Sequence, residues 1–180
     1  GYFPLSLSYL PPIPPWAMPH PKIVLQLCEF PKNSIPLFVY CSLFSKILNS
    51  IPDAIPSFTD GSKISKHSYF AFSVGNQTFS YRHWNIILTV KLQAILQCLI
   101  KILSTPSPPS QSFLIIADSL PALAAISNVY SFYLVITRVH TLLATLFSIP
   151  FSIALSPAIG ASRVMNRSTQ LLKLILIFLS

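Results

Sequence analysis

Two aspartates that follow short apolar runs give this chain its clearest potential for chemistry. Asp60 follows the residues SFT and precedes Gly61 and Ser62, and Asp118 ends the run LIIAD. Both runs are typical of short strands, so the two carboxylates are expected at strand ends. Hard divalent cations prefer oxygen ligands, and two carboxylates side by side can hold metal ions for phosphate chemistry. The pair therefore predicts a divalent-metal site.

The chain has few acidic residues with which to complete such a site. Its 180 residues include four Asp and Glu against twelve Lys and Arg, which gives a formal net charge of +8. The two remaining acids are Glu29 and Asp53. Excess positive charge favours a polyanionic partner, either nucleic acid or an anionic membrane surface, and charge alone does not separate the two.

The apolar composition raises a membrane protein as an alternative. Hydrophobic residues make up 52% of the chain and charged residues 9%. The strongest candidate for a span, residues 132–155, contains Arg138, His140 and Pro150. A charged residue at the centre of a membrane helix costs about 2.5–3.5 kcal/mol, and a span needs roughly 20 apolar residues. We therefore expect no membrane partner, and a small, hydrophobic, basic membrane protein stays as the alternative.

The cysteines indicate a reducing compartment. Cys28, Cys41 and Cys98 have neither CxxC nor metal-ligand spacing, and their odd number argues against a disulfide framework. Free, buried thiols are expected. No signal-peptide pattern precedes the first prolines, and the chain begins with Gly rather than Met. These features predict a fragment of a longer intracellular product, located in the cytoplasm or nucleus.

The aspartates must be positioned by elements that lie after a proline-dense segment. Residues 1–56 are interrupted by prolines throughout, which predicts an extended connector with a short helix at most, over 37–48. Residues 57–180 form the predicted domain, in which Thr89 caps the first helix and Gly75-Asn76 form a hairpin turn. The predicted strands are 57–60, 67–74, 77–81, 113–118 and 151–156, and the predicted helices are 89–103, 120–127, 131–148 and 167–178. This order predicts an α/β fold with a mixed sheet.

Three runs in this domain resemble a known family. They are FTDGSK (58–63), ILTVKLQAIL (87–96) and IIADSLPALAAISN (115–128), with weaker similarity in IALSPAIG (153–160) and TQLLK (169–173). The chain resembles the ribonuclease H type 1 domain at the C-terminal end of non-LTR retrotransposon reverse transcriptases. The resemblance implies a ribonuclease H-like fold, with a mixed sheet of about five strands flanked by helices. It also implies that the chain is part of a longer polyprotein with reverse transcriptase.

The family's activity is hydrolysis of the RNA strand of an RNA–DNA hybrid, so the implied partner is nucleic acid. Four carboxylates hold two Mg²⁺ ions in the family, one activating water and the other stabilising the leaving oxygen. The hybrid is recognised by backbone geometry and 2′-hydroxyls rather than by base sequence. By resemblance, Asp60 and Asp118 are the catalytic metal ligands, and the residues beside them that contact nucleic acid are Gly61, Ser62 and Ser119.

Other positions depart from the family site. Lys91 occupies the place of a glutamate in the family pattern TAELQAI, and Pro157 that of a histidine. The final aspartate falls at Ser168 or Thr169. Two of four carboxylates and no histidine are therefore present. The resemblance thus implies weak or lost Mg²⁺ binding and impaired catalysis, with a non-catalytic nucleic-acid-binding remnant as the alternative.

The same residues also have simpler structural interpretations. Each aspartate, taken alone, suits a turn or a helix cap. The basic residues near the predicted hairpin suit either a nucleic-acid backbone or a solvated edge: Lys63, Lys66, Arg82 and His83. His67, His83 and His140 share no ligand spacing and are expected to be surface or hairpin residues. The alternating aromatics of the hairpin are expected to pack across strands rather than stack on bases.

Overall fold

The computed structural model describes residues 22–24, 36–51, 53–64, 67–83, 86–106, 111–117, 119–131, 133–146 and 151–155. Asp118, Pro157, Ser168 and Thr169 lie outside these ranges, as do Lys66, Cys28 and the helix predicted over 167–178.

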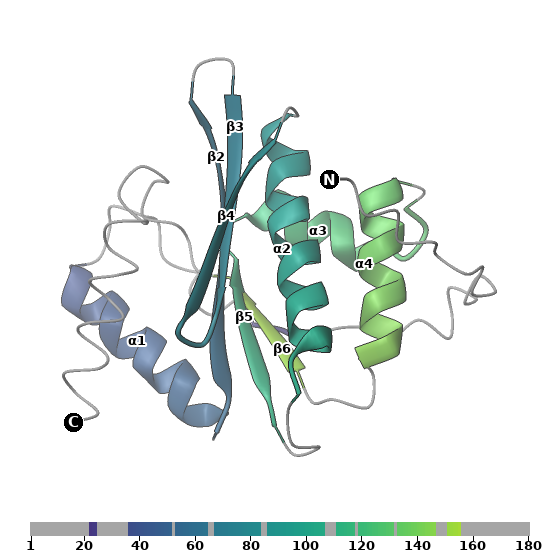
Figure 1. Ribbon diagram of the computed structural model, residues 1–180. Helices are drawn as coiled ribbons and strands as arrows, with labels where there is room; N and C mark the ends of the chain where they lie inside the picture. The colour runs from purple at the N-terminus through teal and green to yellow at the C-terminus, as the bar shows by residue number, and fades with distance from the viewer. Residues whose placement is uncertain are drawn as a thin grey trace.

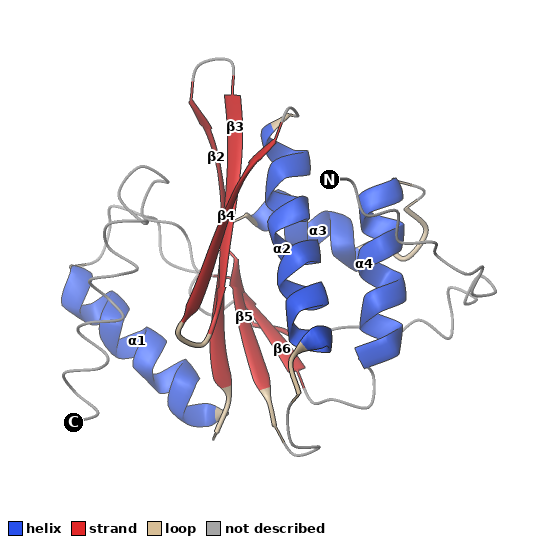
Figure 2. Ribbon diagram, in the orientation of Figure 1, coloured by secondary structure: helices blue, strands red, loops and turns tan. Residues whose placement is uncertain are grey.

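A single mixed sheet forms the centre of the molecule (Figures 1 and 2). Among the described residues it has six strands in the order β1-β6-β5-β2-β3-β4. Antiparallel pairing joins β2 to β3 and β3 to β4, and parallel pairing joins β2 to β5, β5 to β6 and β6 to β1. The strands are β1 (Lys22–Val24), β2 (Ile55–Ile64), β3 (His67–Val74), β4 (Gln77–His83), β5 (Phe113–Ala117) and β6 (Phe151–Leu155). The predicted α/β class with a mixed sheet is confirmed, and the count differs from about five by the short strand β1.

Helices cover both faces of this sheet (Figure 1). On one face lie α2 (Ile87–Ser104), α3 (Leu120–Ser127) and α4 (Leu134–Thr145). On the other lies α1 (Leu37–Ser50), whose Phe44 and Ile47 pack against Leu114 and Ile116 of β5. The short helix predicted over 37–48 is confirmed.

The proline-dense segment contributes to the folded unit. β1 pairs with β6, α1 packs on the sheet, and β2 begins at Ile55, before the predicted boundary at residue 57. An extended connector without packing contacts would leave the α1 face of the sheet uncovered. The apolar residues between Pro36 and Pro52 instead recur at helical spacing, and burying them stabilises α1 against the sheet.

The antiparallel half of the sheet is a hairpin stabilised by aromatic pairs. Phe70 faces Tyr81 at a ring-centroid distance of 5.2 Å, and Phe72 faces Phe79 at 5.0 Å. Gly75 opens the two-residue turn with φ of 55°, which glycine adopts without steric penalty. The predicted turn and the predicted cross-strand packing are confirmed.

The core lies between the sheet and α2. Leu92, Ile95, Leu96, Leu99 and Ile102 recur at helical spacing and are all buried. The start of the helix is predicted wrongly. Ile86 precedes the first turn without a side-chain cap, and Thr89 lies inside the helix, where its hydroxyl is 2.6 Å from the Tyr133 hydroxyl at the start of α4.

Among the described helices, α2 is long and apolar enough to cross a membrane by length and composition, with half of that window buried inside the protein. Core helices of soluble proteins pass the same test. The window that the sequence favours, 132–155, is not one helix, because it contains the twelve-residue α4 followed by strand β6.

Two buried polar groups belong to this packing. His140 is buried rather than at the surface, because its Nε2 donates a hydrogen bond to the Ile126 carbonyl of α3 at 2.6 Å. Cys98 is a buried free thiol, as expected, and Cys41 is half-buried. Burial raises the pKa of Cys98 to about 12, opposed in part by the nearby Ser57 hydroxyl. The thiol therefore stays protonated at neutral pH.

Candidate functional site

Asp60 lies where the parallel part of the sheet ends. The β2–β5 ladder runs from Ile55–Phe113 to Thr59–Ala117, and β2 then continues to Ile64 paired only with β3. The prediction of a strand end at Asp60 is therefore right for the parallel ladder and wrong for the strand, in which Asp60 pairs with Ala71. In open α/β sheets, ligands bind outside the carboxyl ends of parallel strands. Asp60 occupies such a position.

The two strand ends are tied together just before the aspartates. Thr59 donates a side-chain hydrogen bond to the Ile116 carbonyl of β5 at 3.3 Å. Asp118 follows Ala117 directly in the sequence, and Ala117 is the register partner of Thr59. Asp118 itself lies outside the described residues, so its proximity to Asp60 stays a prediction. The Asp60 carboxylate is half-buried, and its Oδ1 accepts a hydrogen bond from the Gly61 backbone N–H at 2.7 Å.

Lys91 of α2 packs directly against the residue that follows Asp60. A Cβ built on Gly61 would lie 2.8 Å from Lys91 Cγ, 3.0 Å from its backbone nitrogen and 3.2 Å from its Cα. Such separations are shorter than normal contacts, so only a glycine lets the helix approach β2 this closely. Glycine at this position is thus required by the docking of α2, a role that the sequence motif did not reveal.

The packing of α2 against Gly61 fixes the point from which the Lys91 side chain extends. Gly61 turns its open side toward α2, so by the alternation of a strand the Asp60 side chain leaves the opposite face. β5 no longer covers this edge of β2 beyond Thr59, and the long stem of a lysine can pass the edge. Lys91 is half-buried.

Ser62 and Ser119 differ in their surroundings. Ser62 is half-buried, two residues beyond Asp60 and on the same face of β2. Ser119 is buried and caps α3, its Oγ accepting a hydrogen bond from the Ala122 N–H at 3.3 Å. The nucleic-acid contacts predicted for Gly61, Ser62 and Ser119 stay predictions, and the structure adds a capping role for Ser119.

Replacing Ser119 by alanine is expected to lower the free energy of unfolding by about 0.5–2 kcal/mol, because the Ala122 N–H loses its acceptor. Urea denaturation measures the change. Ser127→Ala on the last turn of α3 is the matched control, with an expected effect within about 0.5 kcal/mol at this exposed position. Equal effects of the two substitutions would contradict the capping role.

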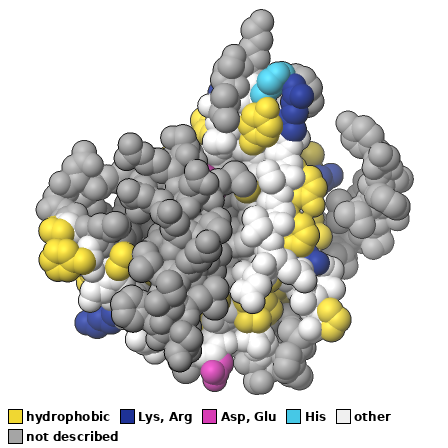
Figure 3. All heavy atoms as spheres, turned by 60° about the vertical axis from the view of Figure 1, so that its left-hand side comes forward, with side chains coloured by type: hydrophobic (Ala, Val, Ile, Leu, Met, Phe, Trp, Pro, Cys, Tyr) yellow, Lys and Arg dark blue, Asp and Glu magenta, His cyan; other side chains and the backbone are white. Residues whose placement is uncertain are grey.

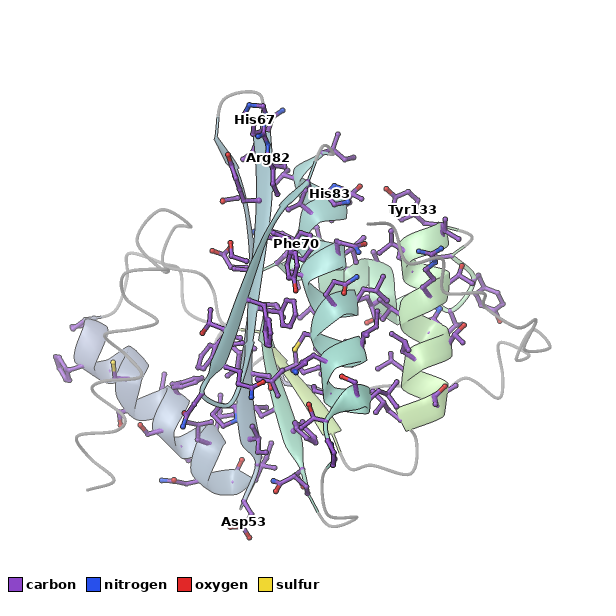
Figure 4. The ribbon with its side chains drawn as sticks, in the orientation of Figure 1. Asp53, His67, Phe70, Arg82, His83 and Tyr133 are labelled. Atoms are coloured by element: carbon purple, nitrogen blue, oxygen red, sulfur yellow. The ribbon has the colours of Figure 1, made fainter. Side chains whose placement is uncertain are left out.

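Basic residues gather at the far end of the β2–β3–β4 ribbon (Figure 4). Arg82 Nη2 lies 2.7 Å from the His67 ring nitrogens, and Lys63 is exposed nearby on β2. Figure 3 shows histidine and basic side chains together at the top of this view. His83 instead contacts the Phe70 ring, at 6.0 Å between centroids.

Register places part of this basic end on the same face as Asp60. Arg82 pairs with Tyr69, and Tyr69 pairs with Ser62, so these three side chains form a row across the sheet. Asp60 and Ala71 form the next such row. An anionic chain lying over this face would meet Arg82 and then the Asp60 end of the sheet.

Within the described ranges there is no group of three or more His, Cys, Asp or Glu that could hold a metal ion. The other described carboxylate, Asp53, lies at the opposite end of the molecule from His67 and Arg82 (Figure 4). No protein-family model matches the chain, and no curated protein matches it.

Proposed function

We propose that this chain is a ribonuclease H-like domain of retroelement origin, which binds nucleic acid and has impaired hydrolytic activity. The observation that carries the proposal is the position of Asp60, at the carboxyl end of the parallel β2–β5 ladder and beside the helix that packs on Gly61. The motif runs FTDGSK, ILTVKLQAIL and IIADSLPALAAISN fall on β2, α2, β5 and α3, the elements that build this end of the sheet. The mixed sheet flanked by helices agrees with the fold that the resemblance implies.

Charge supports nucleic acid as the partner. Basic side chains outnumber carboxylates among the described residues. The exposed basic residues are Lys46, Lys63, Arg82 and Arg138, and the described carboxylates are Asp53 and Asp60 alone. A phosphate backbone is recognised mainly through such basic groups, without reading the base sequence. An RNA–DNA hybrid is the expected ligand, with its 2′-hydroxyls and phosphates contacted by the face that carries Arg82 and Ser62.

Impaired hydrolysis follows from the residues around Asp60. Two-metal hydrolysis needs carboxylates to hold both ions, because charge stabilisation accounts for most of the rate enhancement. Lys91 brings a positive charge where the family has a glutamate. Pro157 and Ser168 or Thr169 replace the family's histidine and last aspartate in the sequence. Mg²⁺ binding, which the ancestral enzyme requires for catalysis, is therefore weak or lost in this chain.

We expect salt-dependent binding of a short RNA–DNA hybrid without its cleavage. Fluorescence anisotropy at 50 and 200 mM salt should show an affinity loss of about tenfold or more, since each phosphate contact adds roughly 0.9 to the log–log salt slope. Gel analysis of the same hybrid with Mg²⁺ or Mn²⁺ should show no cleavage above background. Arg82→Ala should lower the slope by about 1, and Lys46→Ala on α1 serves as the single-charge control.

Two results would contradict the proposal in different ways. Absence of hybrid binding at low salt would exclude the nucleic-acid function. Robust cleavage that Asp60→Asn abolishes would exclude the impairment and restore the ribonuclease activity of the family.

A further inference from the structure

We infer that the ammonium group of Lys91 acts as a built-in cation at the Asp60 end of the sheet, so that this site binds a backbone phosphate without a divalent metal ion. The inference rests on the proposed function and specifies its cation. It also means that the described residues at this end of the sheet do not fit the Mg²⁺ ions that the resemblance implies.

The first support is the fixed position of the lysine. Its backbone nitrogen and Cα press against Gly61, so the start of the side chain is held by the packing of α2 on β2 rather than by a mobile loop. Its Cγ lies within 2.8 Å of the position that a Gly61 Cβ would occupy. Since Asp60 adjoins Gly61, the Lys91 side chain starts one residue away from the aspartate along β2. The packing of α2 on β2 therefore places the start of a cationic side chain at the end of the parallel ladder.

The second support is the donor set. Mg²⁺ demands near-octahedral oxygen ligands and is usually bound through carboxylates. At this end of the sheet the described residues supply the Asp60 carboxylate, one of whose oxygens accepts from the Gly61 N–H. An ammonium group that reaches this carboxylate would oppose the entry of a second cation through like-charge repulsion.

The third support is the chemistry of lysine itself. An ammonium group carries three donors on a flexible stem, so it can hold a carboxylate and a phosphate oxygen at the same time. Phosphates are commonly bound by lysine as a point charge. A lysine that reaches the Asp60 carboxylate can thus bridge it to an anionic backbone, which is the electrostatic part of what a metal ion does in the ancestral site. It cannot activate water in the way that a divalent ion does.

The experiment titrates Mn²⁺, as a spectroscopic probe of divalent binding, into the full chain without nucleic acid. Electron paramagnetic resonance reports free Mn²⁺. The wild-type chain should show no saturable binding up to millimolar metal. Lys91→Glu should create a binding site, because it adds a carboxylate beside Asp60, and Lys91→Glu combined with Asp60→Asn should lose that site. Saturable binding by the wild-type chain, or none by Lys91→Glu in a folded protein, would overturn the inference.

A second arm of the experiment measures the affinity of the chain for the RNA–DNA hybrid. The affinity of the wild-type chain should be unchanged by EDTA, and Lys91→Met should lower the log–log salt slope by about 1. Lys101→Met is the matched control, because Lys101 is equally half-buried on α2 and lies over the Phe79 ring at 5.0 Å, away from Gly61. It should leave the slope unchanged. Loss of hybrid binding in EDTA, or equal slopes for Lys91→Met and wild type, would overturn the inference.

The two arms separate this inference from the proposed function. If the wild-type chain binds no nucleic acid at low salt, the proposed function fails, and the Mn²⁺ titration still decides whether Lys91 excludes a divalent ion. Circular dichroism confirms that each variant is folded before either arm is interpreted.

Discussion

Replacing Leu99 by alanine is expected to lower the free energy of unfolding by about 2–5 kcal/mol. Leu99 is fully buried in the middle of α2, within the core that joins this helix to β3, β5, α3 and α4. Its removal takes away the transfer free energy of the buried side chain and leaves a cavity that the surrounding elements fill only in part. Folded domains have a stability of about 5–15 kcal/mol, so the loss is a large share of the total.

Urea denaturation followed by circular dichroism measures this loss. Leu134→Ala is the matched control, because it makes the same chemical change at a residue that is 64% exposed in the first turn of α4. Its effect should stay within about 0.5 kcal/mol. If Leu99→Ala leaves too little folded protein, Leu99→Val gives a smaller loss in the same direction. Equal effects at Leu99 and Leu134 would contradict the placement of α2 in the core.

Replacing Gly61 by alanine is expected to lower the free energy of unfolding by about 1–3 kcal/mol, as overpacking does in a well-packed core. The new Cβ would meet Lys91 Cγ, which can move, and also the Lys91 backbone nitrogen and Cα, which cannot move without displacing α2. The substitution therefore acts through the distance between α2 and β2. Because Asp60 adjoins Gly61, the same shift should weaken hybrid binding.

A double-mutant cycle with Lys91→Ala tests the mechanism. Removing the Lys91 side chain relieves the contact at Cγ and leaves the backbone contacts, so the two substitutions should be partly non-additive. Gly75→Ala is the control. Its Cβ would lie 3.4 Å from Ile55 Cγ2, an ordinary contact, and its cost of about 1 kcal/mol would come from the positive φ. It should be additive with Lys91→Ala. Full additivity at Gly61 would contradict the proposed contact.

Elements with strong local patterns were predictable from sequence. β3 and α3 have the predicted bounds, because an aromatic alternation and a short apolar helix after a serine cap are properties of neighbouring residues. The hairpin turn at Gly75 is local in the same way. α1 was predicted within a proline-dense segment but not its packing on β5, since the sequence of the helix does not state which face of the sheet it covers.

Errors arose where a distant partner decides the local role. Threonine is a common helix cap, yet the Thr89 hydroxyl contacts the hydroxyl of Tyr133, the residue before α4. The helix itself begins two residues earlier than predicted. His140 is polar enough for the surface, yet the Ile126 carbonyl of α3 accepts its N–H inside the protein. In both cases a hydrogen bond between helices outweighs the local preference, because a buried polar group must find a partner.

For the candidate site, the sequence by itself determined the chemistry: a scarce carboxylate at Asp60, glycine after it, and a lysine at position 91 in an apolar helix. Only the tertiary structure decided that the lysine packs against the glycine. The Asp-Gly-Ser run looks like a strand end, but antiparallel pairing with β3 carries β2 on to Ile64. The parallel ladder stops at Thr59, and α2 closes against Gly61 because glycine has no Cβ to hold it away. Register and close packing depend on residues far apart in the chain, and for this reason the sequence indicated the residues while the fold placed Lys91 next to Gly61.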